Sequence, residues 1–134
     1  MVNGYNKEIT STHLMNYHFV WCPKYRRKLF IGELRNRLID LINEKSKELS
    51  CKILQLEVMP DHIHMFIQGN PKLAPNLIIG QIKGFTSRIL RDEFKQLLKM
   101  PTLWTRSYFV STAGNVSSFV IEQYIEEQYE KNKR

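Results

Sequence analysis

Residues 52–68 read KILQLEVMPDHIHMFIQ, and their pattern decides the fold. Apolar and polar side chains alternate over residues 52–59, which predicts a half-buried strand. The Pro60-Asp61 pair predicts a tight turn. Residues 62–68 then predict a second strand that returns antiparallel beside the first.

The segment His62-Ile63-His64 is the most informative part of this hairpin. Side chains alternate between the two faces of a strand, so both histidines are expected on one face and Ile63 on the other. Two neutral imidazoles placed in this way can bind one divalent cation. Taken alone, the pair could equally be two ordinary structural histidines.

The rest of the chain switches several times between strand and helix patterns. The expected strands cover residues 12–22, 52–59, 62–68 and 103–111, and the expected helices cover residues 33–49, 75–98 and 117–131. The order β-α-β-β-α-β-α predicts an α+β, ferredoxin-like (RRM-like) sandwich with one extra C-terminal helix. We expect a single domain over residues 1–134.

The composition indicates a folded protein with excess positive charge. Hydrophobic residues make up 43% of the 134 residues and charged residues 25%, which is ordinary for a soluble domain. No apolar run approaches the ~20 residues of a membrane span, and the N-terminus lacks a signal-peptide pattern, so we expect a cytoplasmic protein without membrane contact. The net charge of +7 favours a polyanionic partner. Cys22 and Cys51 are expected to be buried free thiols.

The expected C-terminal helix carries a second pair of reactive groups. Tyr124 and Gln128 are four residues apart and therefore share one face. A tyrosine hydroxyl can act as a nucleophile, and the amide oxygen of Gln128 can bind a hard cation. Attack on a phosphodiester would give a phosphotyrosine ester, which a free hydroxyl can reverse without ATP. Tyr129 lies on another face and is the rival nucleophile.

Four blocks of the sequence resemble one family. They are YHFVWCPKYR at residues 17–26, MPDHIH at residues 59–64, WTRSYFVSTAG at residues 104–114 and YIEEQ at residues 124–128. With these blocks in this order, the chain resembles the small single-tyrosine transposases of prokaryotic insertion sequences, which belong to the HUH endonuclease superfamily. Ser107 departs from the family pattern, where glycine is expected more often, and we expect this change to leave the chemistry untouched.

The resemblance implies a function and a set of site residues. It implies that His62, His64 and Gln128 bind a divalent metal, Mg²⁺ or Mn²⁺, and that Tyr124 is the nucleophile. Members of this family are homodimers that cut and rejoin single-stranded DNA through a 5′-phosphotyrosine link and recognise hairpins at the element ends. The tyrosine helix of one subunit can complete the site of the other. From the ligands alone, Mn²⁺ is expected to bind more tightly than Mg²⁺.

Basic residues in two segments, together with one tyrosine, are candidates for DNA contacts. They are Lys24, Tyr25, Arg26, Arg27 and Lys28 before the first helix, and Arg88 and Arg91 on the long helix. Cations bind phosphates, and a tyrosine can stack on an unpaired base. A charge run of this kind is also common in solvated loops.

Three further residues are candidates for a place beside the histidine pair. Asp61 could act as a base or as an outer metal ligand, but its position after Pro60 equally suits the turn, and we expect either the turn or a contact with the metal ligands. Glu57 is expected to face solvent. His18 could neighbour the site, but we expect a hydrogen-bonded structural role for it.

Two other functions stay open on the sequence alone. A non-catalytic module could hold single-stranded nucleic acid on an RRM-like sheet, although the K/R-G-F/Y pattern of such modules is missing. A domesticated relative that processes hairpins outside a mobile element would use the same chemistry as a transposase.

Overall fold

The computed structural model describes residues 15–112 and 123–128 of the chain. Its strands are β2 (Asn16–Trp21), β3 (Lys52–Met59), β4 (His62–Gln68) and β5 (Phe109–Ser111). Its helices are α2 (Gly32–Glu48) and α3 (Pro75–Glu93), with short 3-10 helices η1 (Lys24–Arg26) and η2 (Lys95–Lys99). Residues 123–128 are also helical.

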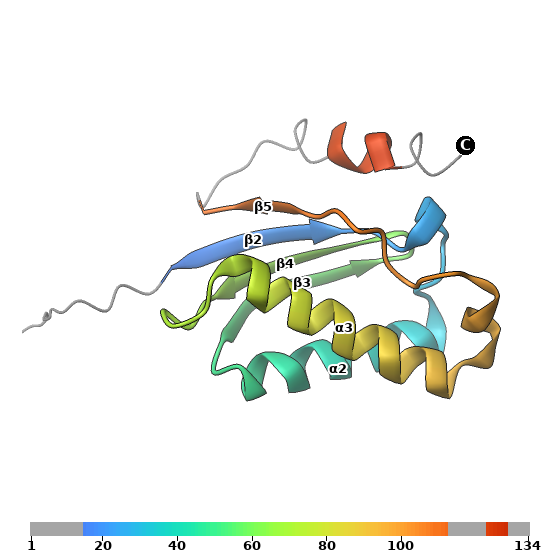
Figure 1. The fold of residues 1–134 in the computed structure, drawn as a ribbon, viewed down its shortest axis with the longest axis horizontal. Coiled ribbons are helices and arrows are strands. Elements are labelled where there is room, and N and C mark those ends of the chain that lie inside the picture. Colours follow the sequence, from blue (N-terminus) through green and yellow to red (C-terminus); the bar gives the residue numbers. More distant parts are fainter. Residues whose placement is uncertain (1–14, 113–122, 129–134) are drawn as a thin grey trace, which may run out of the picture.

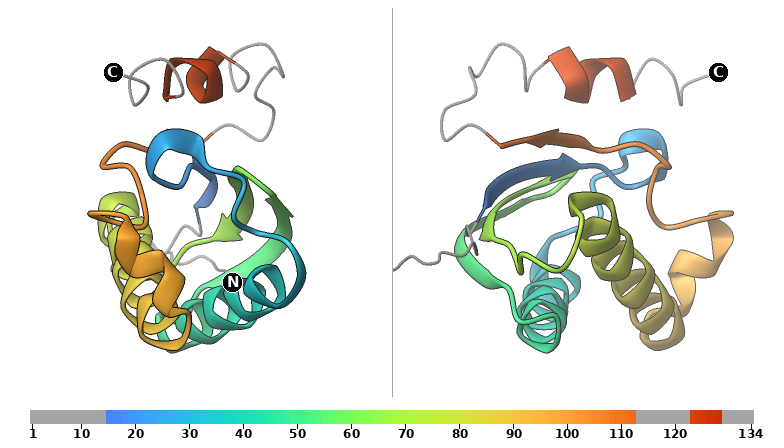
Figure 2. Two further views of the ribbon diagram at one scale, coloured as in Figure 1. Left: turned by 90° about the vertical axis from the view of Figure 1, so that its right-hand side faces the viewer. Right: turned by 60° about the vertical axis from the view of Figure 1, so that its left-hand side comes forward.

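The four described strands form one antiparallel sheet in the order β3-β4-β2-β5. Helices α2 and α3 cover one face of this sheet, and the helical residues 123–128 lie over the opposite face (Figure 1 and Figure 2). The crossovers through the two long helices place β2 and β4 in the centre. The structure confirms the predicted α+β architecture, with an antiparallel sheet covered by two helices as in a ferredoxin-like sandwich, and residues 123–128 are helical as predicted.

Strand β4 divides its side chains between the core and the open face of the sheet. Ile63, Met65 and Ile67 are fully buried on the face that the helices cover. The residues between them point the other way and are partly exposed. The predicted alternation is confirmed, and it places His62 and His64 on the open face, away from the core.

A β-bulge changes the direction of the side chains in β3. The register shifts just before Gln55, which leaves Leu54 as an extra residue in the ladder. Gln55 then pairs with Phe66, and Glu57 pairs with His64. Because residues paired across two strands share a face, both polar side chains stand on the open face beside the histidines.

The fourth strand is shorter than predicted. Only residues 109–111 pair as β5, whereas the sequence pattern predicted a strand over residues 103–111. Trp104 forms only an isolated antiparallel bridge, with Pro23, and between this bridge and β5 the ammonium group of Lys83 of α3 binds the backbone. It donates to the carbonyl oxygens of Thr105 (2.7 Å), Arg106 (3.4 Å) and Ser107 (3.2 Å).

The other boundaries differ from the prediction by smaller amounts. The first long helix begins and ends one residue earlier than predicted. The second ends at Glu93, and η2 then turns the chain so that Leu97 is buried. Parts of the predicted segments 12–22 and 117–131 lie outside the described residues.

The cysteine prediction is confirmed, since Cys22 and Cys51 are free and buried. Among the helices that the structure describes, none is long and apolar enough to cross a membrane.

Trp104 anchors the segment that leads into β5. Its ring lies 5.2 Å from that of Phe30 and 5.9 Å from that of Trp21, measured between centroids. Its indole N–H donates to the hydroxyl of Thr86 at 3.0 Å, and this hydroxyl donates to the carbonyl oxygen of Ile82 at 2.8 Å. Trp104 and Thr86 are buried, so the indole has no alternative partner in water.

Thr86→Val is expected to lower the free energy of unfolding by about 1–3 kcal/mol, because the buried indole N–H loses its acceptor. Urea denaturation followed by circular dichroism would measure this change. In a Trp104→Phe background the same substitution should cost much less, since no indole N–H remains to be satisfied. An equal cost in both backgrounds would contradict the role given to this hydrogen bond.

Candidate active site

The two histidines lie together on the open face of β4. Their ring centroids are 4.9 Å apart, and His64 stands in register with Val20 of β2. Burial, and then the charges that His62 and His18 would carry, lower the pKa of His64 to about 4. The ring of His64 is therefore neutral at neutral pH, which is the form of imidazole that binds a metal ion.

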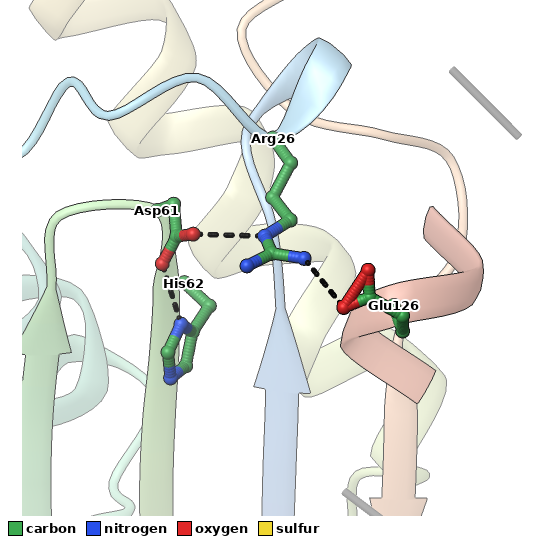
Figure 3. A network of polar contacts seen from close by, with 4 residues as sticks. All are labelled: Arg26, Asp61, His62 and Glu126. Atoms are coloured by element: carbon green, nitrogen blue, oxygen red, sulfur yellow. Dashed lines mark hydrogen bonds and ion pairs between the residues drawn. The ribbon is translucent and has the colours of Figure 1, made fainter. Parts of the chain in front are cut away.

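Asp61 fixes the ring of His62. One carboxylate oxygen lies 2.8 Å from His62 Nδ1, and the other accepts a hydrogen bond from Arg26 Nε at 2.8 Å (Figure 3). Burial alone would raise the pKa of this carboxyl group, but the hydrogen bonds from Arg26 and His62 lower it. An ionised carboxylate can only accept, so His62 Nδ1 is the donor and Nε2 is the nitrogen left for a metal.

The turn predicted at Asp61 is confirmed. Asp61 lies in the two-residue turn between β3 and β4, and it also contacts a predicted ligand, His62. Its influence on a bound metal stays a prediction.

Arg26 connects this carboxylate to the C-terminal helix. Its Nη1 donates to Glu126 Oε2 at 3.5 Å (Figure 3). Arg26 and Tyr25 have positive φ angles of 49° and 65°, a region that costs non-glycine residues about 1–2 kcal/mol each. The strained η1 segment therefore delivers the guanidinium group to Asp61, and the ion pair helps to offset that strain.

The helical residues 123–128 dock on the same face of the sheet as the histidines. A small apolar cluster fastens them there, formed by Val20, Cys22, Phe109, Tyr124 and Ile125. Val20 stands directly beside His64 in the sheet. The helix that carries the candidate nucleophile therefore covers the surface next to the candidate metal ligands.

Tyr124 and Gln128 meet at Ser107. The hydroxyl of Ser107 donates to Gln128 Oε1 at 2.7 Å and lies 3.3 Å from the hydroxyl of Tyr124. Either hydroxyl can be the donor in the second contact. The shared face predicted for Tyr124 and Gln128 is confirmed. The side chain of Ser107 contacts both residues, and the expectation that this serine leaves the chemistry untouched stays a prediction.

Tyr124 is held in its protonated form. Burial raises the pKa of Tyr124 to about 12, and hydrogen bonds with Ser107 and Thr105 lower it only in part. Within the described residues, Tyr124 makes no hydrogen bond to either histidine. The structure thus gathers two pairs on one face, His62 with His64 and Tyr124 with Gln128. The rival Tyr129 lies outside the described residues.

The donors at this site fit a divalent cation bound partly by neutral ligands. In the part of the chain that the structure describes, no three side chains of His, Cys, Asp or Glu are placed to hold a metal ion together. The two imidazoles would therefore need an amide, water or phosphate oxygen to complete a metal site. A mixed nitrogen and oxygen set of this kind suits Mn²⁺ and leaves open positions for a substrate.

The basic cluster before α2 surrounds an exposed aromatic ring. Lys24 Nζ lies 5.5 Å and the Arg27 guanidinium 5.6 Å from the ring centroid of Tyr25, and Tyr25 is 38% exposed. Arg26 turns away from this ring toward Asp61. Lys28 borders a cavity of about 340 Å³ that lies against the Arg26 ion pairs.

The two arginines of α3 lie elsewhere. The guanidinium of Arg88 lies 5.7 Å from the ring centroid of Phe85, and Arg91 donates to the carbonyl oxygen of Met100 at 3.0 Å. Since α3 covers the face of the sheet opposite the histidines (Figure 1), these candidates for DNA contact do not adjoin the candidate active site.

The structure shows contacts for three residues that the sequence did not place among the site residues. His18 lies beside His64, with ring centroids 5.7 Å apart. His18 forms no hydrogen bond within the described residues, so the hydrogen-bonded structural role expected for it stays a prediction, while Glu57 is exposed as predicted. Strand alternation could have placed His18 on the open face. The serine at position 107, where the family more often has glycine, could have marked Ser107 as a residue that affects the site. Nothing in the sequence indicated the contacts of Lys83 with the segment before β5.

The comparisons with known proteins cover most of this chain. The family model described as "Transposase IS200 like" matches residues 11–128. The ISDra2 transposase TnpA of Deinococcus radiodurans is 30% identical over 120 residues, which are 87% of this chain and 86% of that protein. The transposase for insertion sequence element IS200 of Salmonella typhimurium is 34% identical over 120 residues, 87% of this chain and 78% of that protein.

Two solved structures share the fold. The crystal structure of a candidate transposase from Deinococcus radiodurans gives a TM-score of 0.83 at 28% identity, over 96% of this chain and 98% of that one. A REP-associated tyrosine transposase bound to a REP hairpin gives a TM-score of 0.57 at 13% identity, over 87% of this chain and 66% of that one, which is a likeness of fold alone. The family match and the relatives together show that this chain belongs to the family of IS200-like transposases.

Proposed function

We propose that this chain is a metal-dependent transposase that cuts and rejoins single-stranded DNA at the ends of an insertion sequence. His62, His64 and Gln128 would hold a Mg²⁺ or Mn²⁺ ion, and Tyr124 would form a 5′-phosphotyrosine link. The observation that carries the proposal is the oriented ring of His62, with its Nδ1–H directed to Asp61 beside the neutral ring of His64.

The chemistry follows from the groups of the chain itself. When bound, the cation would supply positive charge at the scissile phosphate. The phenol of Tyr124, with a pKa of about 12, must lose its proton before its oxygen can attack phosphorus. That attack forms the tyrosine O–P bond and releases a 3′-hydroxyl. A 3′-hydroxyl that later attacks the same phosphorus rejoins the strand and returns the tyrosine.

We also propose that the chain recognises hairpins at the element ends and acts as a homodimer. The net charge of +7 and the hairpin bound by a relative of the same fold support the first part. The second part is supported by β5, which lies at the edge of the sheet formed by the described strands and carries Val110 with 37% of its surface exposed. An open apolar edge of this kind is a surface on which a second copy can pair.

Wild-type protein is expected to form a covalent adduct with single-stranded oligonucleotides copied from the DNA that flanks its own gene, and only when Mn²⁺ or Mg²⁺ is present. Tyr124→Phe should abolish this adduct, because phenylalanine has no oxygen to attack phosphorus. Denaturing gels of labelled oligonucleotides would measure the adduct. Tyr129→Phe is the matched control and should retain it. An adduct that survives Tyr124→Phe and disappears in Tyr129→Phe would contradict the assignment.

Asp61→Asn is expected to weaken Mn²⁺ binding by about 10- to 100-fold, because the neutral amide no longer fixes the ring of His62 as strongly. Titration of free Mn²⁺ by electron paramagnetic resonance would measure the affinity. The exposed Asp92→Asn on α3 removes the same charge and should leave Mn²⁺ binding unchanged, while a His62→Ala/His64→Ala double variant should abolish it. Equal affinities of the Asp61→Asn and wild-type proteins would count against the site.

A further inference from the structure

A cavity opens on the sheet surface immediately beside His64. It has a volume of about 190 Å³ and is lined by His18, Gln55, Glu57, His64 and Phe66. This volume is below the ~300–1,000 Å³ of cavities that take drug-sized ligands. The cavity therefore suits one ring system rather than a whole nucleotide.

Two rings of the lining stand on the central strands of the sheet. His18 of β2 pairs in register with Phe66 of β4, and their rings meet at 75° with centroids 6.3 Å apart. Aromatic side chains on the open face of an RRM-like sheet are the surfaces on which unpaired bases stack. Because the two rings are nearly perpendicular, one of them can stack on the flat face of a base while the other meets that base with its edge.

Gln55 and Glu57 supply the polar edge of the cavity. Both reach the open face because Leu54 is the extra residue of the β3 bulge. Within the described residues, neither side chain makes a hydrogen bond or an ion pair. The charge of Glu57 does act on the neighbouring imidazoles, where it raises the pKa of His18 and of His64 against the effect of burial. The bulge thus adds to the aromatic surface two polar groups that can still hydrogen-bond a ligand.

The negative charge of Glu57 argues for a base rather than a phosphate. A carboxylate repels the DNA backbone, and it stands here within a chain of net charge +7. The carboxylate of Glu57 can accept a hydrogen bond from an amino group, such as N4 of cytosine. The amide of Gln55 can pair with N6 and N7 of adenine. Thymine has no amino group and presents an acceptor, O4, in that place.

We propose that this cavity binds one unpaired base that carries an exocyclic amino group, and that Glu57 and Gln55 set which base is accepted. The inference rests on the proposed single-strand chemistry, because a base inside a duplex cannot enter the cavity. His64 and Phe66 are two residues apart on β4, about 7 Å. The bound base therefore belongs to a nucleotide at or next to the phosphate that the histidines face.

Selection from a randomised single-stranded DNA library tests this site without cleavage. Tyr124→Phe protein in Mn²⁺ would bind the library, and the bound strands would be sequenced. We expect thymine to be depleted about tenfold at one position. Adding Glu57→Gln should remove most of this depletion. Adding Glu44→Gln, an exposed carboxylate of α2, changes the net charge equally and should leave the depletion in place.

Phe66→Ala tests the stacking surface of the cavity separately from its polar edge. It removes a stacking surface that every base can use, so it should weaken binding about tenfold without changing the base preference. Fluorescence anisotropy with labelled oligonucleotides chosen from the selection would measure the affinity.

Four outcomes decide the inference. A library without thymine depletion, or the same depletion with and without Glu57→Gln, would overturn it. Loss of Mn²⁺ binding in Glu57→Gln without a change in base preference would also overturn it, because the cavity would then be part of the metal site. If Glu57→Gln changes the base preference but wild-type protein forms no covalent adduct, the base site stands and the proposed cleavage fails.

Discussion

The carboxylate of Asp61 is the group on which the arrangement of the site depends. It lies in the turn that joins β3 to β4, it accepts from His62 Nδ1, and it accepts from Arg26. Arg26 in turn reaches Glu126 on the C-terminal helix. A mostly buried carboxylate is tolerated only when it is paired. The hairpin, the strained η1 segment and the C-terminal helix are therefore tied to one ionised group (Figure 3).

The contacts that dock the C-terminal helix are few and of different strength. The exposed pair between Arg26 and Glu126 at 3.5 Å contributes about 0–1 kcal/mol. The burial of Ile125 against the sheet contributes more, since a fully buried aliphatic side chain is worth about 1.5–3 kcal/mol. The hydroxyl of Ser107 adds the two polar contacts, to Tyr124 and to Gln128. Burial, and not Ser107, holds Tyr124 in the protonated form that does not attack phosphorus, because the hydrogen bond with Ser107 lowers the pKa of the phenol. The side chain that replaces the expected glycine thus links the candidate nucleophile to Gln128 and partly opposes the effect of burial.

The sequence pattern predicted those parts of the structure that depend only on the alternation of side chains along one strand. The bounds of β3 and β4 and the common face of His62 and His64 follow from strand alternation, and both agree with the structure. The bulge at Leu54 and the shortened β5 cannot be predicted from the alternation of side chains within one strand. The first depends on the register between two strands, and the second on three carbonyl groups that Lys83 reaches from another element. The place of Ser107 between Tyr124 and Gln128 is likewise a contact between distant segments, which spacing along the chain does not encode.

The central claim is that Tyr124 forms the covalent bond to DNA beside a metal held by His62 and His64. The most direct measurement is mass spectrometry of the adduct after nuclease trimming of the DNA and proteolysis of the protein. The account predicts a nucleotide joined through its 5′-phosphate to Tyr124, formed only in the presence of Mn²⁺ or Mg²⁺. A nucleotide on another residue, or an adduct that forms equally well without divalent metal, would contradict it.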